Sequence, residues 1–349
     1  MMQGFLDALR CDATRFKYRN NISIVLGDVD GFIDLAKSDR RKAEDFLIKW
    51  VSVRRGKVTG TTIRGNMYAL KSLLSFYEVD LNWRRINMSI PHGRRVASDR
   101  CPTVVEIRKL LSVCDKRMKA CVLVMCCSGV RVGALESMNL KDYVKQDSGV
   151  GRLKIYRGEV EEYNTFITPE SVAALDDYLD DRRRIGEVLK SDSPLFRDNW
   201  NCMDGQRHRL SPELRVNRIS SKTLRTRLCY LWVKAGVREH ISKRGEFQQA
   251  HGFRKWFKTH AERSMNRDDV EVLMGHILNY YKPSTEHLEE VYLKAVPFIT
   301  VSEVVHLKSE YEAKIRERDQ QIESMMSKIL SLEVNVNNLV NLTNIKQKD

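Results

Sequence analysis

An uninterrupted apolar run at residues 120–127, Ala-Cys-Val-Leu-Val-Met-Cys-Cys, restricts the fold more than any other stretch of this chain. A helix without a polar side has to be buried inside a domain. The run is far shorter than the roughly 20 residues that cross a bilayer, and it is followed by Ser128 and Gly129, which typically end a helix. We therefore predict a buried helix here, and we expect neither a membrane span nor a signal peptide.

Residues 1–90 are predicted to form a small helical domain. Apolar residues recur every three or four positions over 43–55 and again over 61–79, which is the period of an amphipathic helix. Either Thr61 or Thr62 is a suitable N-cap for the second of these helices.

Residues 91–102 are predicted to link two domains, because they combine prolines, a glycine and basic side chains with almost no apolar content. Residues 103–300 then form a second domain in which helices predominate. The alternating, β-rich segments 151–157 and 162–169, separated by Gly158 and acidic residues, predict a hairpin. The expected fold class is mainly α with a small β-sheet, that is, α+β.

Residues 301–349 carry a coiled-coil pattern. Positions spaced by seven hold Ile315, Ile322, Ile329 and Val336, and positions three residues later hold Met325, Leu332 and Leu339. Charged residues occupy the flanking positions, so the pattern predicts a C-terminal coiled-coil helix that self-associates. The alternative is a single amphipathic helix that packs on the rest of the chain.

The charge balance favours a polyanionic partner, nucleic acid first and an anionic membrane second. The 60 lysines and arginines outnumber 46 acidic residues, which gives a formal net charge of +14. Arg94 and Arg95 of the basic linker are candidate contacts to a phosphate backbone. The eight cysteines include no Cys-x-x-Cys pair, so we expect reduced thiols in a cytosolic protein, with no structural metal.

Two motifs place arginines where they suit an anion. In Ala-His-Gly-Phe-Arg (250–254), His251 and Arg254 are three positions apart, so a helix presents both side chains on one face. Arg131 follows Ser128 and Gly129 at the start of a predicted helix, where backbone amides and a guanidinium can both face a phosphate. Taken singly, each residue has an ordinary explanation as a capped histidine or a solvated arginine.

A third motif is Leu-Met-Gly-His at 273–276, followed by Tyr280, Tyr281 and Tyr292. His276 comes directly after a helix-terminating glycine, so it is free to project into a cleft. For a single tyrosine, the ordinary explanation is a packed ring with a solvated hydroxyl.

The order of these motifs resembles the tyrosine recombinase (phage integrase) family over residues 100–296: an arginine after Ser-Gly, a β-hairpin, His-x-x-Arg, Leu-x-Gly-His and a tyrosine. Segments such as Tyr-Tyr-Lys-Pro-Ser-Thr-Glu-His look most like archaeal virus or provirus integrases and Xer-like recombinases. The resemblance implies that a helical core-binding domain (1–90) and a catalytic domain (103–300) clamp double-stranded DNA. It also implies a homo-oligomer, a tetramer on DNA, located in the cytoplasm with the nucleoid.

By this resemblance, a tyrosine hydroxyl attacks a DNA phosphodiester and forms a 3′-phosphotyrosine, without a metal, a nucleotide or another cofactor. Arg131 and Arg254 are expected to stabilise the charge that develops on the phosphate. His251 is the expected base, and His276 the expected donor to a nonbridging oxygen. A base is needed because a phenol with a pKa near 10 is a poor nucleophile at neutral pH.

The chain departs from the family pattern in the hairpin. The family usually has a lysine in this turn, which protonates the leaving 5′-oxygen, whereas the matching position here holds Arg157. An arginine stays protonated and is a poor proton donor. Either Lys154 takes over from the strand, or Arg157 acts electrostatically while water supplies the proton.

The spacing of the tyrosines also departs from the family, in which the tyrosine follows the histidine by about nine positions. Tyr280 and Tyr281 follow His276 by four and five positions, and Tyr292 by sixteen. A deletion before Tyr-Tyr-Lys-Pro keeps Tyr281 in the matching position, so Tyr281 is the predicted nucleophile. Tyr292 and Tyr280 remain the alternatives.

Other functions fit part of the sequence. A DNA-binding protein of the same fold without cleavage would keep the charge and the linker. A type IB topoisomerase-like relaxase would share the tyrosine and the arginines but would act as a monomer. A purely structural coiled-coil protein leaves the ordered motifs of residues 127–281 unexplained.

Overall fold

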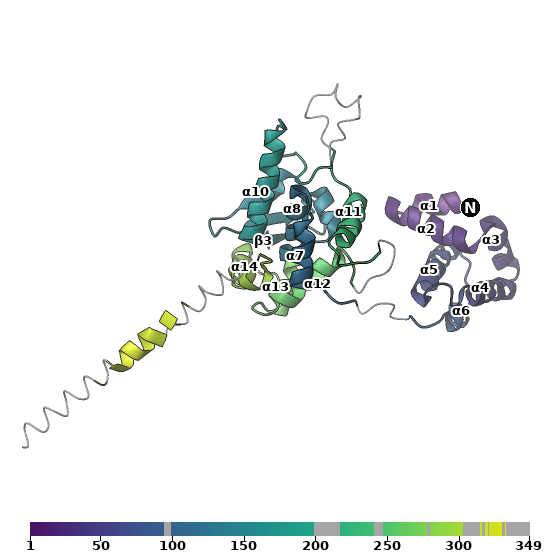
Figure 1. Cartoon of the computed structure of the whole chain (residues 1–349). Helices are drawn as coiled ribbons and strands as arrows, with labels where there is room; N and C mark the ends of the chain where they lie inside the picture. Colours follow the sequence, from purple (N-terminus) through teal and green to yellow (C-terminus); the bar gives the residue numbers. More distant parts are fainter. Residues whose placement is uncertain are drawn as a thin grey trace, which may run out of the picture. The chain divides into compact units, whose positions relative to one another are not determined.

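The computed structural model describes residues 1–93, 99–198, 217–240, 247–277 and 280–302, and positions 315, 318–319, 321–329 and 332 of the tail. The chain divides into two compact units, Met1–Val96 and Ala97–Asp349 (Figure 1). Arg94 and Arg95, the candidate linker contacts, lie outside the described residues.

The first unit is built from helices around one apolar core. Its helices are α1 (Met2–Ala8), α2 (Asp12–Val25), α3 (Val29–Ser38), α4 (Arg40–Arg54), α5 (Gly60–Phe76) and α6 (Trp83–Ser89). Helix α5 packs against α1 and α2, and α3 packs against α4. The apolar positions that recur in the sequence, such as Ile63, Leu70 and Leu47, are fully buried in this core.

Helix α5 begins earlier than the sequence predicts, so the prediction of Thr61 or Thr62 as its N-cap was wrong. The N-cap is Thr59, whose side chain accepts a hydrogen bond from the backbone N of Thr62. Gly60 is the first residue of the helix rather than a residue before it. A Cβ at Gly60 would lie 2.1 Å from the backbone O of Pro91, so a close approach of two backbone segments explains this glycine.

The second unit contains the remaining elements with described bounds. They are α7 (Val104–Ser112), α8 (Lys116–Ser128), α9 (Val132–Ser137), the short 3-10 helix η1 (Leu140–Asp142), β1 (Tyr143–Lys145), β2 (Gly151–Ile155), β3 (Tyr163–Ile167), α10 (Pro169–Arg184), α11 (Ser221–Lys234), α12 (His251–Ala261), α13 (Arg267–Leu273) and α14 (Thr285–Ile299). The three strands form an antiparallel sheet in the order β1-β2-β3. The mainly helical α+β class is therefore confirmed, and the predicted hairpin is β2 and β3. Strand β1 was not predicted.

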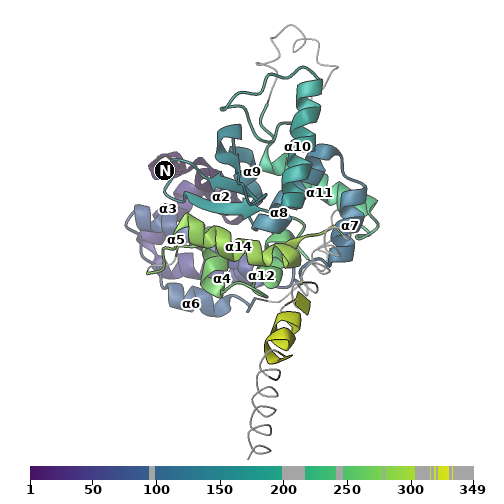
Figure 2. The same cartoon turned by 90° about the vertical axis from the view of Figure 1, so that its left-hand side faces the viewer.

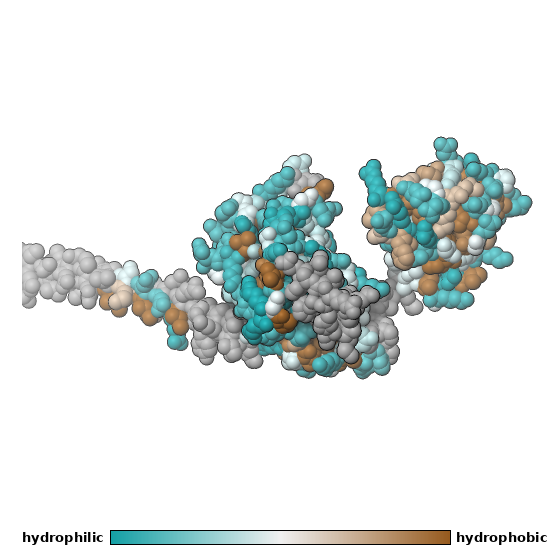
Figure 3. Space-filling view, turned by 90° about the horizontal axis from the view of Figure 1, so that it is seen from above, coloured by the Kyte–Doolittle hydropathy of each residue, from teal (hydrophilic) through white to brown (hydrophobic). Residues whose placement is uncertain are grey.

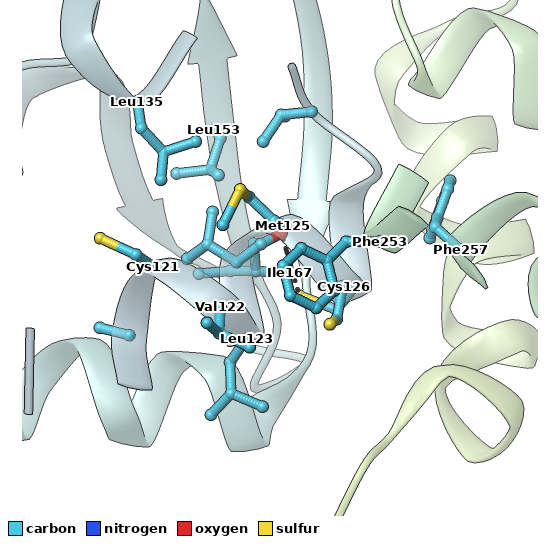
Figure 4. Packing of buried hydrophobic residues seen from close by; sticks show 14 of the residues in the cluster. Cys121, Val122, Leu123, Met125, Cys126, Leu135, Leu153, Ile167, Phe253 and Phe257 are labelled. Carbon is cyan, nitrogen blue, oxygen red and sulfur yellow. Dashed lines mark hydrogen bonds between the residues drawn. The ribbon is translucent and has the colours of Figure 1, made fainter. Parts of the chain in front are cut away.

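Helix α8 lies at the centre of this unit, as the apolar run at 120–127 predicts. All residues of that run are buried, and α8 contacts α10, α12 and β3. In Figure 4, side chains of α8 lie beside Leu153 and Ile167 of the sheet and Phe253 of α12, and Phe257 belongs to the same buried cluster. The helix ends at Gly129, which adopts a positive φ of 62°. The chain turns there and brings Arg131 out of the core.

Two further helix starts position the functional segments. Thr103 forms a capping box with Glu106 at the start of α7. Ser284 caps α14 by accepting a hydrogen bond from the backbone N of His287. Helix α14 packs against α12, beside which it lies in Figure 2. None of the described helices has the length and apolar content that crossing a membrane requires.

The described positions of the tail are helical, and their apolar side chains are exposed. Ile315, Ile322, Met325, Ile329 and Leu332 each leave more than half of their surface in solvent. Figure 3 shows hydrophobic residues gathered along one side of this helix. Val336 and Leu339, which complete the predicted heptads, lie outside the described residues.

Candidate active site

Arg254 is the buried centre of the candidate site. It lies in α12, only 4% exposed, where a charged side chain requires partners. Its Nη1 donates to the backbone O of Gly129 at 2.5 Å, and its Nη2 donates to the backbone O of Met274 at 2.7 Å. Burial, followed by the charge of Arg131, lowers the pKa of Arg254. One guanidinium therefore joins the end of α8 to the segment after α13.

Arg131 is the exposed N-cap residue of α9, directly after the turn at Gly129. Its charge contributes to the lowered pKa values of both Arg254 and His251. The structure therefore brings Arg131 and Arg254 to one place, although 123 positions separate them in the sequence. Two guanidiniums close together, one buried and one exposed, are chemically suited to bind an anion.

His251 is the first residue of α12 and is exposed to solvent. Partial burial of the ring, then the charges of Lys255 and Arg254, lower the pKa of His251 below its ordinary value of 6.5. The imidazole is therefore neutral at neutral pH and able to accept a proton.

His276 contacts Arg254 and a carboxylate at the same time. Its Nε2 lies 2.8 Å from Nη2 of Arg254, and its Nδ1 contacts Glu271 of α13. The preceding Gly275 has a φ of 73°, and a Cβ there would lie 2.3 Å from the ring of Tyr163. Only glycine permits this turn and this close packing, and the turn brings His276 back toward α12.

The β2–β3 hairpin holds the two candidates for the leaving-group acid. Lys154 forms an ion pair of 2.8 Å with Glu162, and both side chains are about one-third exposed. Arg157 contacts the buried Asp142 through Nε and donates to the backbone O of Lys141 at 2.9 Å. Both candidates line one polar cavity of about 150 Å³.

The turn between β2 and β3 is strained close to the arginines. Tyr156 adopts a positive φ of 52°, which is uncommon for a bulky residue and occurs preferentially at functional sites. The charges of Arg131 and Arg254 both act on the pKa of Tyr156, although burial raises that pKa overall. The hairpin therefore reaches the arginine pair.

The three tyrosines differ sharply in environment. Tyr280 is fully exposed. The hydroxyl of Tyr281 donates to Asp269 at 2.6 Å, and this contact, followed by partial burial, raises the pKa of Tyr281. Tyr292 is 0% exposed and donates to the backbone O of Cys127 at 2.9 Å. Among the contacts of the described residues, none joins a tyrosine at 280, 281 or 292 to Arg131 or Arg254.

Several residues that interact with these candidates were missed by the sequence reasoning. Glu271 contacts His276, Lys258 contacts Glu271, Asp269 holds Tyr281, and Asp142 holds Arg157. Except for Glu271, which belongs to the segment just before His276, each partner comes from a different element of the chain. No local period or motif indicates such pairs, which only the packing of separate elements creates.

The sequence and the fold agree on the class of protein. Residues 103–279 match the phage integrase family, and the chain belongs to this family of tyrosine recombinases. No curated protein sequence matches the chain significantly.

Solved structures of DNA-bound recombinases share the fold. The chain is similar to a lambda integrase(75-356) dimer bound to a COC′ core site, at 12% identity and a TM-score of 0.54, over 83% of this chain and 92% of that chain. A lambda integrase tetramer bound to a Holliday junction gives 13% identity and a TM-score of 0.51, over 83% of this chain and 74% of that chain. The XerH recombinase bound to palindromic difH, a post-cleavage complex, gives 16% identity and a TM-score of 0.50, over 78% and 72%. At these identities the likeness shows the fold alone.

Proposed function

We propose that this chain is a site-specific DNA recombinase that cleaves and rejoins DNA through a 3′-phosphotyrosine intermediate, without a metal or ATP. The observation that carries the proposal is the cluster of Arg131, His251, Arg254 and His276, which come from three separate segments of a chain of this family. The basic net charge of +14 suits a DNA substrate. We infer that the protein acts on DNA in the cytoplasm, as an integrase of the archaeal virus or provirus type.

In the proposed reaction, the tyrosine oxygen attacks the phosphorus and the bond to the 5′-oxygen breaks. The five-coordinate transition state carries more negative charge on its nonbridging oxygens than the ground state. Arg131 and Arg254 stabilise this charge as cationic donors, and the backbone contacts of Arg254 fix its position before the reaction begins. His251 accepts the tyrosine proton, which its lowered pKa permits at neutral pH. His276 donates to a nonbridging oxygen.

Tyr281 is the proposed nucleophile. Its hydroxyl must first leave Asp269, since that contact holds the phenol protonated. Tyr292 is a weaker candidate, because its ring is fully buried and its hydroxyl is already paired with Cys127. Tyr280 is exposed and stays an alternative.

For the leaving 5′-oxygen, we propose Lys154 as the acid in preference to Arg157. Arg157 is anchored to the buried Asp142 and to the backbone O of Lys141, and a guanidinium does not release its proton. Lys154 pairs with Glu162, a residue of similar exposure, and shares the cavity with Arg157. An ammonium group transfers its proton far more readily than a guanidinium.

Covalent trapping on nicked suicide substrates tests the function and the nucleophile together. We expect wild type and Tyr292→Phe to form covalent DNA adducts, and Tyr281→Phe to form none. Adducts that persist in Tyr281→Phe and vanish in Tyr292→Phe would transfer the role to Tyr292. Relaxation of a supercoiled plasmid without a target site would favour the topoisomerase-like alternative.

A second candidate function rests on the Tyr281–Asp269 contact, which keeps the proposed nucleophile paired with a carboxylate. A DNA-binding member of the family without cleavage would keep this pairing when bound to DNA. Binding to target DNA without any adduct in the trapping assay would support this candidate.

We propose that the tail supports assembly on DNA, in keeping with the dimer and tetramer in the lambda integrase structures. An isoleucine stripe exposed on one side of a helix needs a partner surface, and a second copy of the same helix provides one. Removal of residues 305–349 should spare binding to a single site but weaken multimers. Identical association states of the full-length and truncated proteins in sedimentation would contradict this role.

We also propose that residues 1–90 are the core-binding domain, and that Arg94 and Arg95 of the linker at 91–102 contact phosphates. Replacing both with alanine should weaken binding to all sequences alike and reduce the salt slope, log K against log salt, by about two. An unchanged slope would exclude the linker from the contact surface.

A further inference from the structure

Glu271 connects two basic side chains of the candidate site. It lies near the end of α13, and its carboxylate contacts Nζ of Lys258 through one oxygen and Nδ1 of His276 through the other. The backbone O of Glu271 also accepts a hydrogen bond of 2.9 Å from the backbone N of His276. Glu271 therefore contacts both the ring and the backbone of His276.

The partners of His276 fix the position of its proton. An ionised carboxylate can only accept hydrogen bonds, and a guanidinium can only donate them. Burial acts to raise the pKa of Glu271, but the hydrogen bonds from Lys258 and His276 lower it overall, so this carboxyl group is ionised. With Glu271 at Nδ1 and Arg254 at Nε2, a neutral His276 must carry its proton on Nδ1.

We propose that Glu271 is a positioning residue, which fixes the ring orientation and the tautomer of His276 and thereby aims Nε2 at the anion site formed with Arg254. Glu271 is only 14% exposed, so its carboxylate acts in a partly dry environment where the contact is strong. Lys258 holds the second oxygen and keeps Glu271 from turning away. The proposal rests on the proposed function only in the role that it gives to His276.

The contact with Arg254 shows where the second ring nitrogen lies. Nε2 of His276 is 2.8 Å from Nη2 of Arg254. The ring that Glu271 holds at Nδ1 therefore presents Nε2 to the guanidinium that is proposed to bind the phosphate.

Replacement of Glu271 with glutamine is the sharpest test. Lys258 attracts the amide oxygen, which leaves the amide NH₂ group facing Nδ1 of His276. A donor at that place requires Nδ1 to accept, so the ring has to switch to the Nε2–H tautomer or turn away from Arg254. The matched control is Glu262→Gln, since Glu262 also pairs with Lys258, at 3.8 Å, but has no contact with His276 among the described residues.

The first measurement uses ¹⁵N-labelled full-length protein without DNA. Ring-nitrogen chemical shifts report the tautomer, and the loss of signals in His276→Gln assigns them. We expect the Nδ1–H form in wild type and in Glu262→Gln, and its loss in Glu271→Gln. Thermal melts of the three proteins check that each is folded. An unchanged Nδ1–H signal in Glu271→Gln would overturn the proposal.

The second measurement is the single-turnover rate of covalent cleavage, together with DNA affinity. We expect Glu271→Gln to cleave about tenfold more slowly with unchanged affinity, a size typical of lost support for an active histidine. Equal rates in Glu271→Gln and wild type would overturn the positioning role. If wild type forms no adduct, the proposed function fails, while the ring-nitrogen shifts still decide whether Glu271 sets the tautomer.

Discussion

The anion site around Arg254 and the segment that carries Tyr281 differ in how far they are prepared for chemistry. Arg254 is buried, and two backbone carbonyls and His276 fix its position. The hydroxyl of Tyr281 instead donates to Asp269, which raises its pKa. One part of the proposed mechanism is assembled in the free protein, and the other part is held in a protonated, paired state.

This difference separates binding from reaction. The guanidinium of Arg254 is held in place before a phosphate binds, and a donor fixed in advance stabilises developing charge. A tyrosine paired with a carboxylate is protected from deprotonation until the pairing ends. We therefore infer that release of Tyr281, rather than formation of the anion site, is the step that target DNA controls.

The largest effect is expected when Arg254, the centre of the anion site, is replaced. Arg254→Ala should lower single-turnover cleavage about 100- to 1,000-fold, because a preorganised donor to the transition state is lost. The carbonyls of Gly129 and Met274 also lose their donor, at a cost of about 1–3 kcal/mol each in folding stability. Rapid-quench assays of adduct formation measure the rate, and urea unfolding measures the stability.

Arg183→Ala is the matched control for this variant. Arg183 lies on α10, more than half exposed, and pairs only within its own helix among the ion pairs of the described residues. It should cleave at the wild-type rate. A wild-type rate in Arg254→Ala as well would mean that the buried guanidinium supports the fold and not the reaction.

The sequence predicts best those elements whose pattern lies within one segment of the chain. The buried α8, the hairpin and the buried positions of α5 all follow from apolar periods within one segment. Strand β1 was missed because three residues, Tyr143–Lys145, are too few to show an alternating pattern.

For the site, sequence supplied residue types but not pairings. His251 and Arg254 could be placed on one helix because their spacing is local. The contact between Lys258 and Glu271 joins α12 to α13, and the contact between Arg157 and Asp142 joins the hairpin to η1. Such contacts depend on how elements pack, which no local period encodes.

A second prediction concerns the acidic limb of the pH profile, where the cleavage rate falls as the pH is lowered. The pKa of His251 is lowered, first by burial and then by Lys255, so the base stays neutral until the pH falls below 6.5. Cleavage should therefore fall as the pH falls through this lowered pKa. Lys255→Met removes a nearby positive charge that lowers the pKa, while the charge of Asp99, which acts to raise the pKa, stays in place. The limb should move to higher pH, with a rate loss of up to about tenfold on the limb itself.

The pH profile of adduct formation checks this expectation, with DNA kept saturating. His251→Ala should cleave slowly and show no such limb. A limb that stays in place in Lys255→Met would remove His251 as the group that sets it.

A third prediction concerns the contact between the Tyr281 hydroxyl and Asp269. Asp269→Asn replaces a charged acceptor for the Tyr281 hydroxyl with a neutral one, which weakens the contact by about 1 kcal/mol. Cleavage should rise about fivefold if release of Tyr281 limits the rate. The pKa of Tyr281 should fall, because Asp269 is the main cause of its increase. Ultraviolet titration, compared with a Tyr281→Phe background, measures this change.

The raised pKa of Tyr281 also determines how folding stability depends on pH. Because the folded state raises the pKa of Tyr281, the Tyr281–Asp269 contact contributes stability at pH values below the ordinary tyrosine pKa of 10 and loses it as the pH rises through the raised value. Asp269→Asn should be less sensitive to alkaline pH than wild type. Slower cleavage in a folded Asp269→Asn protein would mean that Asp269 assists the tyrosine instead of restraining it.

The smallest effect is expected at Tyr292, which separates a structural tyrosine from the reactive one. Tyr292→Phe keeps the buried ring and its contact with Phe166 but removes the hydrogen bond to the backbone O of Cys127. The loss of one buried hydrogen bond should reduce folding stability by about 1 kcal/mol. Urea unfolding should show this loss while adduct formation stays at the wild-type rate, because burial and the Cys127 contact raise the pKa of Tyr292 well above its ordinary value and oppose its ionisation. A Tyr292→Phe protein of wild-type stability that forms no adduct would reverse the comparison, since the buried tyrosine would then have to leave the core to react.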